Sequence, residues 1–356
     1  MQRYNILYNK SIILRKQTNV VMKYLKILVL VMVVAFSSCG PKTPEYKKKL
    51  FAANGTAPEL VFHRYEDVLF NLDTTRFQEA LMEVQEQYLP FLSGDLTDTL
   101  AVKYLRDFAV DTLSISLYHK VKTAFPDLNE VEEMVRNVYR HFNYYYPDVN
   151  LPTQVYTCVS GIDPEVPSVI FLDDALVISL DWYLEGDDIY EWIGMPQYRS
   201  ARIAKSGLAK DLGQEIYLDY VQQSIKCNNL LEEMIEAGRM YFFVEALCPS
   251  LDDEVLLGYT PSQLQWAEDF EGDLWADIVG SQVLYTSDLE VYRTFLADGP
   301  FTNEYSHEAP ARLGEFIGLH IIRSFVKANP NVALHEIMEE RDLQAIFQES
   351  HYKPKK

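Results

Sequence analysis

The chain has 356 residues, is 48% hydrophobic and 24% charged, and carries a formal net charge of −20. This composition is typical of a folded globular protein, and the length suffices for one large hydrophobic core or two modest ones. Residues 1–38 hold six basic residues and no acidic one, so all of the excess acid lies further along the chain. A nucleic-acid-binding protein needs a basic face to displace counterions from phosphate. The composition therefore argues against that class and indicates a solvated acidic surface.

Residues 22–40, MKYLKILVLVMVVAFSSCG, have the pattern of a secretion signal. Two lysines precede ten apolar residues, Ile27 to Phe36, which are too few to span a bilayer but suit the core of a signal peptide. Small residues then lead to Cys39, as in the bacterial lipoprotein box that this stretch resembles. The resemblance implies cleavage before Cys39, diacylation of that residue and stable anchoring by several acyl chains. An ordinary signal peptide with an incidental cysteine is the alternative.

The organisation predicted from these signals is simple. A signal peptide covers residues 1–38, and translation is expected to start at Met22, because signal peptides usually begin close to their basic region. The polar, proline-containing residues 39–58 are predicted to be a lipidated tether. Residues 59–350 are expected to form a single domain, followed by a tail over residues 351–356.

Three cysteines remain beyond the lipoprotein box, Cys158, Cys227 and Cys248. The envelope permits disulfides, but an odd count leaves at least one thiol unpaired. The sequence does not determine whether any pair forms.

Helical patterns dominate the body in chain order, with strand patterns in the middle. Helices are predicted over residues 77–92 (capped from Asp73), 98–109, 128–143, 215–226, 228–247, 262–284 and 311–328. The short β-branched and aromatic segments 155–162, 168–174 and 175–184 predict strands. The fold class that follows is α+β, mostly helical, with a small sheet around residues 155–184 packed against helices. Gly314 and Gly318, four residues apart, predict that helix 311–328 packs closely against a neighbour.

Two His-Glu pairs raise the question of a metal site. A zinc-peptidase helix needs histidines at positions i and i+4 with a glutamate beside the first. After His307 the fourth residue is Ala311, and after His335 it is Glu339, so neither pair completes the motif. His320 is expected to be a hydrogen-bonded, partly buried residue. No nucleophile elbow, phosphate-binding loop or dinucleotide fingerprint is present, so neither a metal nor a cofactor is predicted.

Long blocks of the chain resemble one family. They include the lipobox SSCG, LLEEMIEAGRMYFFVEALCP at 230–249, GYTPSQLQWAEDFEGDLW at 258–275 and EAPARLGEFIGLHIIRSFV at 308–326. These blocks resemble the gliding motility lipoprotein GldB of the Bacteroidota. The resemblance implies an envelope lipoprotein needed for gliding and for the linked type IX secretion system.

A weaker resemblance is to the gluzincin-type metallopeptidase scaffold, in which strands are followed by two helices. With the zinc helix placed on residues 215–226, Gln222 and Lys226 occupy the ligand positions and Gln223 the position of the general base. Glu236 then falls near the third ligand. Lysine repels a dication and glutamine cannot act as a general base, so the resemblance implies a degenerate, inactive zinc site.

The function predicted from the sequence is that of a lipid-anchored, non-catalytic envelope protein of the GldB type. It is expected to act through protein partners of the gliding or type IX secretion machinery. No acidic run follows Cys39 of the kind associated with surface export, which favours a domain facing the periplasm. The alternative is a divergent, peptidase-like hydrolase of the envelope on the same scaffold.

Overall fold

The computed structural model describes residues 43–163, 166–302 and 304–354. The predicted signal peptide and Cys39 lie outside the described residues. Residues 49–356 form one unit, and the account below concerns that unit. No helix in the described part of the chain combines the length and the apolarity needed to cross a membrane.

Helices make up most of the ordered elements, as predicted. They are α2 (Glu45–Ala52), α3 (Tyr65–Leu69), α4 (Phe77–Val84), α5 (Leu89–Leu92), α6 (Thr99–Val110), α7 (Thr112–Ala124), α8 (Asn129–Tyr145), α9 (Ile189–Trp192), α10 (Gln197–Ser200), α11 (Gly207–Ile216), α12 (Leu230–Leu247), α13 (Asp253–Leu257), α14 (Pro261–Asp269), α15 (Glu271–Gly280), α16 (Leu289–Leu296), α17 (Leu313–Ala328), α18 (Leu334–Glu339) and α19 (Leu343–Ser350). A 3₁₀ turn, η1 (Leu180–Tyr183), and a π turn, η2 (Tyr217–Val221), complete the helical elements, and the strands are β1 (Val61–Arg64), β2 (Gln154–Cys158), β3 (Val169–Leu172) and β4 (Ala175–Ser179).

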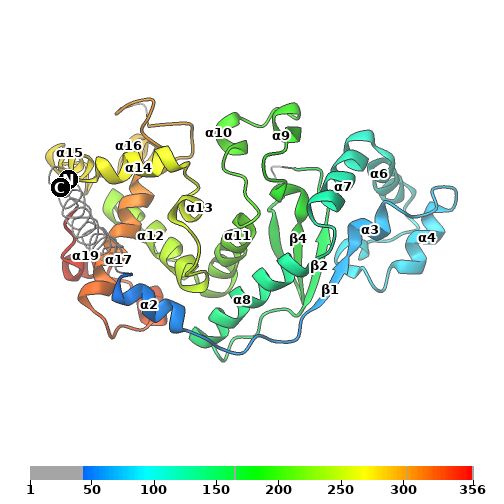
Figure 1. Cartoon of the computed structure of the whole chain (residues 1–356), viewed down its shortest axis with the longest axis horizontal. Coiled ribbons are helices and arrows are strands. Elements are labelled where there is room, and N and C mark those ends of the chain that lie inside the picture. The colour runs from blue at the N-terminus through cyan, green and yellow to red at the C-terminus, as the bar shows by residue number, and fades with distance from the viewer. Residues whose placement is uncertain (1–42, 164–165, 303, 355–356) are drawn as a thin grey trace, which may run out of the picture. The chain divides into compact units, whose positions relative to one another are not determined.

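The four strands form one mixed sheet in the order β1-β2-β4-β3 (Figure 1). β1, β2 and β4 are parallel, and β3 runs antiparallel to β4 at one edge. The predicted small sheet is confirmed, but two details were wrong. β1 lies about ninety residues before the predicted strands, and its four residues VFHR carry too short a pattern to stand out. The predicted strand 175–184 ends at Ser179, where the chain turns into η1.

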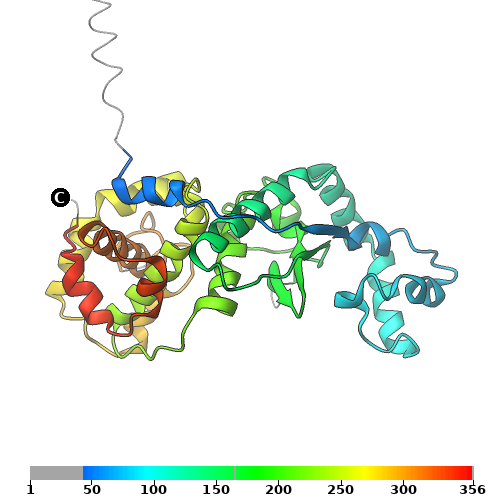
Figure 2. The ribbon, with the colours of Figure 1, turned by 90° about the horizontal axis from the view of Figure 1, so that it is seen from below.

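Helices cover both faces of the sheet. One face presents Tyr156, Cys158, Ala175 and Val177 to a hydrophobic cluster that includes residues of α3, α4, α5 and α6. On the other face α11 packs against β3, and α8 packs against α11. Figures 1 and 2 show the elements of residues 65–110, in blue to cyan, on one side of the strands and the yellow-to-red helices on the other.

The helices α12 and α17 pack most closely of all, at their glycines. A Cβ atom on Gly318 would overlap the main-chain carbonyl of Met234, and one on Gly238 would overlap the backbone at Gly318. Gly314 is confined less tightly, with the Phe295 carbonyl 2.9 Å from where its Cβ would lie. The predicted close packing of the Gly314 and Gly318 face is confirmed.

Several helix boundaries differ from the prediction. The helix predicted from residue 77 to 92 breaks into α4 and α5, with Arg76 rather than Asp73 at its N-cap. The helix predicted over 262–284 breaks at Phe270. Part of the predicted tether is ordered, because Leu50 and Ala53 are buried and the Gly55 N–H donates to the Arg140 carbonyl at 3.2 Å.

Candidate functional site

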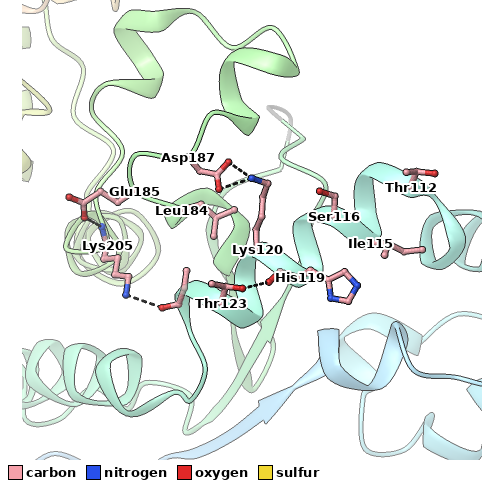
Figure 3. Close-up of a pocket in the computed structure, with 11 residues that line it drawn as sticks. Thr112, Ile115, Ser116, His119, Lys120, Thr123, Leu184, Glu185, Asp187 and Lys205 are labelled. Atoms are coloured by element: carbon pink, nitrogen blue, oxygen red, sulfur yellow. Dashed lines mark hydrogen bonds and ion pairs between the residues drawn. The ribbon is translucent and has the colours of Figure 1, made fainter.

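A cavity of 680 Å³ lies between α7 and the loop that follows η1 (Figure 3). One wall is a polar stripe of α7, and the other comes from the loop and from the segment before α11. The lining residues are Thr112, Ile115, Ser116, His119, Lys120, Thr123, Ala124, Leu184, Glu185, Asp187 and Lys205.

The charged groups of this cavity are already paired with protein. Lys120 Nζ lies 2.7 Å from Asp187 Oδ1, and this hydrogen bond raises the pKa of Lys120. Lys205 Nζ donates to the Ala124 carbonyl at 2.9 Å and pairs with Glu130 at 3.1 Å. In Figure 3 the His119 imidazole points away from the Lys120–Asp187 pair. These contacts join α7 to its neighbours, and they do not set a nucleophile beside a base.

The positions proposed for a degenerate zinc site do not share a helix. The helix predicted over 215–226 is displaced: α11 ends at Ile216, η2 ends at Val221, and Gln222 has the extended angles φ −59 and ψ 125. Gln223 Oε1 instead accepts a hydrogen bond from Arg341 at 3.2 Å, and Lys226 is exposed. Placing the zinc helix on this segment was therefore wrong, because a helix that ends at Val221 cannot present Gln222 and Lys226 from one face.

Glu236, the proposed third ligand, is held by two protein groups. Tyr217 donates its hydroxyl to Glu236 Oε1 at 2.9 Å, and Arg239 Nη1 lies 3.4 Å from Oε2. Arg239 is only 1% exposed and also donates to the main-chain carbonyls of Met338 and Glu340. Glu236 is thus part of the packing between α12 and its neighbours.

A second hollow, of 310 Å³, lies one to two helical turns before the predicted positions. Gln214, Glu215 and Leu218 face it from α11 and η2, and Val169 faces it from β3. Gln214, Glu215 and Leu218 are spaced at i, i+1 and i+4. The residues predicted for the degenerate zinc site, at 222, 223 and 226, have the same spacing. The helix predicted over 215–226 included Glu215 and Leu218 and began one residue after Gln214, and nothing in QEIYL marks these residues as a site. Leu218 has no donor atom, so this set cannot hold a metal through that position.

The wall of this second hollow is a buried hydrogen-bond network. Tyr183 donates to Asp211 Oδ2 at 2.8 Å, and Ser168 Oγ donates to the same oxygen at 3.0 Å. Lys210 pairs with the other oxygen, Asp211 Oδ1, at 3.1 Å. Burial and the nearby carboxylate raise the pKa of Tyr183, which keeps the phenol protonated as a donor.

The two histidines of residues 307 and 320 lie in different settings. His307 is exposed and meets the Phe301 ring edge-on. His320 Nδ1 lies 2.7 Å from Glu271 Oε1, an oxygen that also accepts the Tyr352 hydroxyl. The prediction of a hydrogen-bonded, partly buried His320 is confirmed. Across the described residues, no three histidine, cysteine or acidic side chains converge in a way that could hold a metal ion.

A family model described as the gliding motility protein GldB matches residues 47–354. The chain belongs to the GldB family. Membership identifies a gliding-motility-related envelope protein, and the family is a lipoprotein family. No curated protein matches the sequence, and no solved structure matches the fold. The likeness to a metallopeptidase scaffold therefore stays a prediction, while the GldB assignment covers almost all of the described residues.

Proposed function

We propose that this GldB-family chain is anchored in the envelope by lipid on Cys39 and works by binding other proteins of the gliding and type IX secretion machinery. The observation that carries the proposal is the family match over residues 47–354. The lipobox before that span supplies the anchor, and several acyl chains give stable attachment. The domain, over residues 59–350 with a short tail, faces the periplasm.

A non-catalytic role is supported by how the polar groups are engaged. In the larger cavity Lys120 and Asp187 are bound to each other. Glu236 is held by Tyr217 and by the buried Arg239. Groups that act in catalysis need a free position at which substrate can meet them. These groups instead stabilise the fold, which leaves binding as the role best supported.

Crosslinking in living cells tests this proposal. The full-length protein, tagged at its C-terminus and expressed from its own locus, is crosslinked and recovered from native membranes. Envelope components of the gliding or secretion machinery should be enriched over a tagged lipoprotein of unrelated family. Recovery of no envelope protein above that control would contradict the proposal.

One observation favours the alternative of a divergent hydrolase. Glu215 lies in the second hollow, where a carboxylate beside a bound peptide could act on it. Hydrolysis of a mixture of fluorogenic peptides by the purified full-length protein separates the two functions. Cleavage that is lost in Glu215→Gln would favour the hydrolase, and protein that cleaves no peptide but retains its envelope partners would favour the binding role.

A further inference from the structure

β3 is an edge strand whose outer side has no strand partner in the described part of the chain. The backbone groups on that side are arranged to pair with another strand. Ser179 N–H donates to the Ser168 carbonyl at 2.8 Å, which fixes the alternation along β3. Ser168, Ile170 and Leu172 therefore turn their backbone groups toward β4, and Val169 and Phe171 turn theirs outward.

The second hollow lies beside this free edge. Val169 lines it together with Glu215 and Leu218, so it adjoins the outward backbone groups of β3. Phe171, on the same face as Val169, meets the Tyr220 ring edge-on with centroids 5.1 Å apart. Leu218 is 49% exposed, which leaves apolar surface open along the rim.

The charge of the hollow is unbalanced. Lys210 pairs with Asp211, but no described side chain forms a hydrogen bond or ion pair with Glu215. Asp219, one turn further along, is exposed and adds a second negative charge. Burial and the carboxylates of Asp219 and Asp211 raise the pKa of Glu215. A cation brought into the hollow would relieve this crowding.

We propose that the outer edge of β3 binds an extended segment of a partner protein that carries a lysine or arginine two residues from an apolar residue. The segment pairs its backbone with Val169 and Phe171. Side chains of paired residues point to the same face, so the basic side chain opposite Val169 meets Glu215 and the apolar one opposite Phe171 meets Tyr220. This inference rests on the proposed function as a binding protein and names the mode by which a partner is held.

Peptide binding to the purified full-length protein in detergent tests the mode. The probe is the peptide fluorescein-Gly-Gly-Thr-Lys-Thr-Leu-Thr-amide, labelled at its N-terminus so that the lysine amine stays free, and binding is measured by fluorescence polarisation. In two analogues the backbone amides of alternate residues are methylated: Lys and Leu in one, the three Thr in the other. One of the two should lose roughly tenfold or more in affinity and the other little, because only one set of amides faces β3. Equal binding by both analogues, or no binding of the parent peptide, would overturn the proposal.

Variants of the protein test the charge. Glu215→Gln should weaken binding of the lysine peptide about fivefold at low salt and leave a peptide with norleucine in place of lysine unchanged. Glu86→Gln is the matched control, because Glu86 is an exposed glutamate outside the hollow. An effect of the same size in both variants, or in neither, would contradict a specific contact with Glu215.

The same variant in cells separates this inference from the function on which it rests. If wild-type protein recovers envelope partners and Glu215→Gln recovers fewer, the binding function and the β3 docking site are both supported. If both recover the same partners in equal yield, the β3 edge is not the docking site, and the binding function remains. If neither recovers any partner, the binding function itself fails.

Discussion

At the scale of single residues, Gly238 and Gly318 decide how the two central helices approach. Each lacks the Cβ atom that would meet the backbone of the other helix. Glycine costs a helix interior about 1 kcal/mol relative to alanine, so its use at both positions shows that close packing outweighs propensity here. The spacing of Gly314 and Gly318 could be seen in the sequence, but the partner Gly238 could not, because contact between distant segments leaves no local pattern.

Gly318→Ala should therefore destabilise the protein strongly. The new methyl group must push aside the main-chain carbonyl of Met234, which no rotamer change can relieve. We expect a loss of at least about 3 kcal/mol in the free energy of unfolding, measured by urea denaturation. Gly280→Ala is the control, because no atom lies within 4 Å of its added Cβ. A Gly318 variant as stable as the Gly280 variant would show that the helices do not pack as described.

Glu215 should make stability fall as the pH rises. Its pKa lies above the ordinary 4.5 because of burial first and the charges of Asp219 and Asp211 second. A group with a raised acid pKa holds its proton more tightly in the folded state, so ionisation at higher pH weakens folding. Glu215→Gln should thus match the wild type at pH 4 and exceed it at pH 7. Since the side chain is partly exposed, we expect only a few tenths of a kcal/mol.

Urea denaturation of the wild type and of Glu215→Gln at pH 4 and pH 7 tests the direction of this pH dependence. The difference between wild type and Glu215→Gln isolates one carboxylate from all others, which are common to the two chains. A wild type that is more stable than the variant at pH 7 would mean that Glu215 has a favourable partner, against the charge imbalance described for the hollow.

At the scale of elements, the sequence predicted the helices that have clear ends. α6 begins at Asp98 and α12 at Asn229, and both cap residues accept a backbone N–H of the first turn. The helix that carries the second hollow was placed wrongly, because α11 starts at Gly207 after Ser206, whose side chain makes no cap. Its π turn also ends the helix without a proline or glycine to mark it. The site was missed because nothing in QEIYL marks its residues as one.

Arg239 joins two elements that are a hundred residues apart. It donates to the main-chain carbonyls of Met338 and Glu340 at the end of α18, and it lies 3.4 Å from Glu236 of its own helix. The last carbonyls of a helix have no partner within it, so a buried helix end needs such a donor.

Arg239→Met keeps most of the buried volume and removes the donors. We expect a loss of about 3 kcal/mol in the free energy of unfolding, because the buried Met338 carbonyl, the partly buried Glu340 carbonyl and the Glu236 carboxylate lose a partner. Arg76→Met is the control, since Arg76 pairs with Glu79 on the surface with its side chain 56% exposed and should leave the urea midpoint nearly unchanged. Equal urea midpoints for the two variants would contradict the role given to Arg239.

At the scale of the whole molecule, three features lie in different parts of the chain: the packed helices, the edge strand β3 and the lipobox that precedes the family match. The pair of helices α12 and α17 is closely packed at its glycines, whereas the edge strand β3 with the hollow beside it is where we propose that a partner binds. The proposed lipid anchor at Cys39 precedes both regions in the chain, and under that proposal the partner lies at the membrane. The anchor can thus be tested without altering the folded domain, because it lies outside the family match of residues 47–354.

Cys39→Ser should release the protein from the membrane fraction. The substitution removes the thiol that receives the acyl chains in the proposed anchor. Labelling cells with an alkyne fatty acid and fractionating them measures both effects: the wild type should be labelled and sediment with membranes, and the variant should lose its label. Cys227→Ser, a partly exposed thiol within the domain, is the control and should behave as the wild type. Because stable attachment needs more than one acyl chain, an unlabelled variant that has been cleaved from its signal peptide and still sediments would show that protein contacts hold the chain at the membrane, and lipid on Cys39 would then not be the anchor.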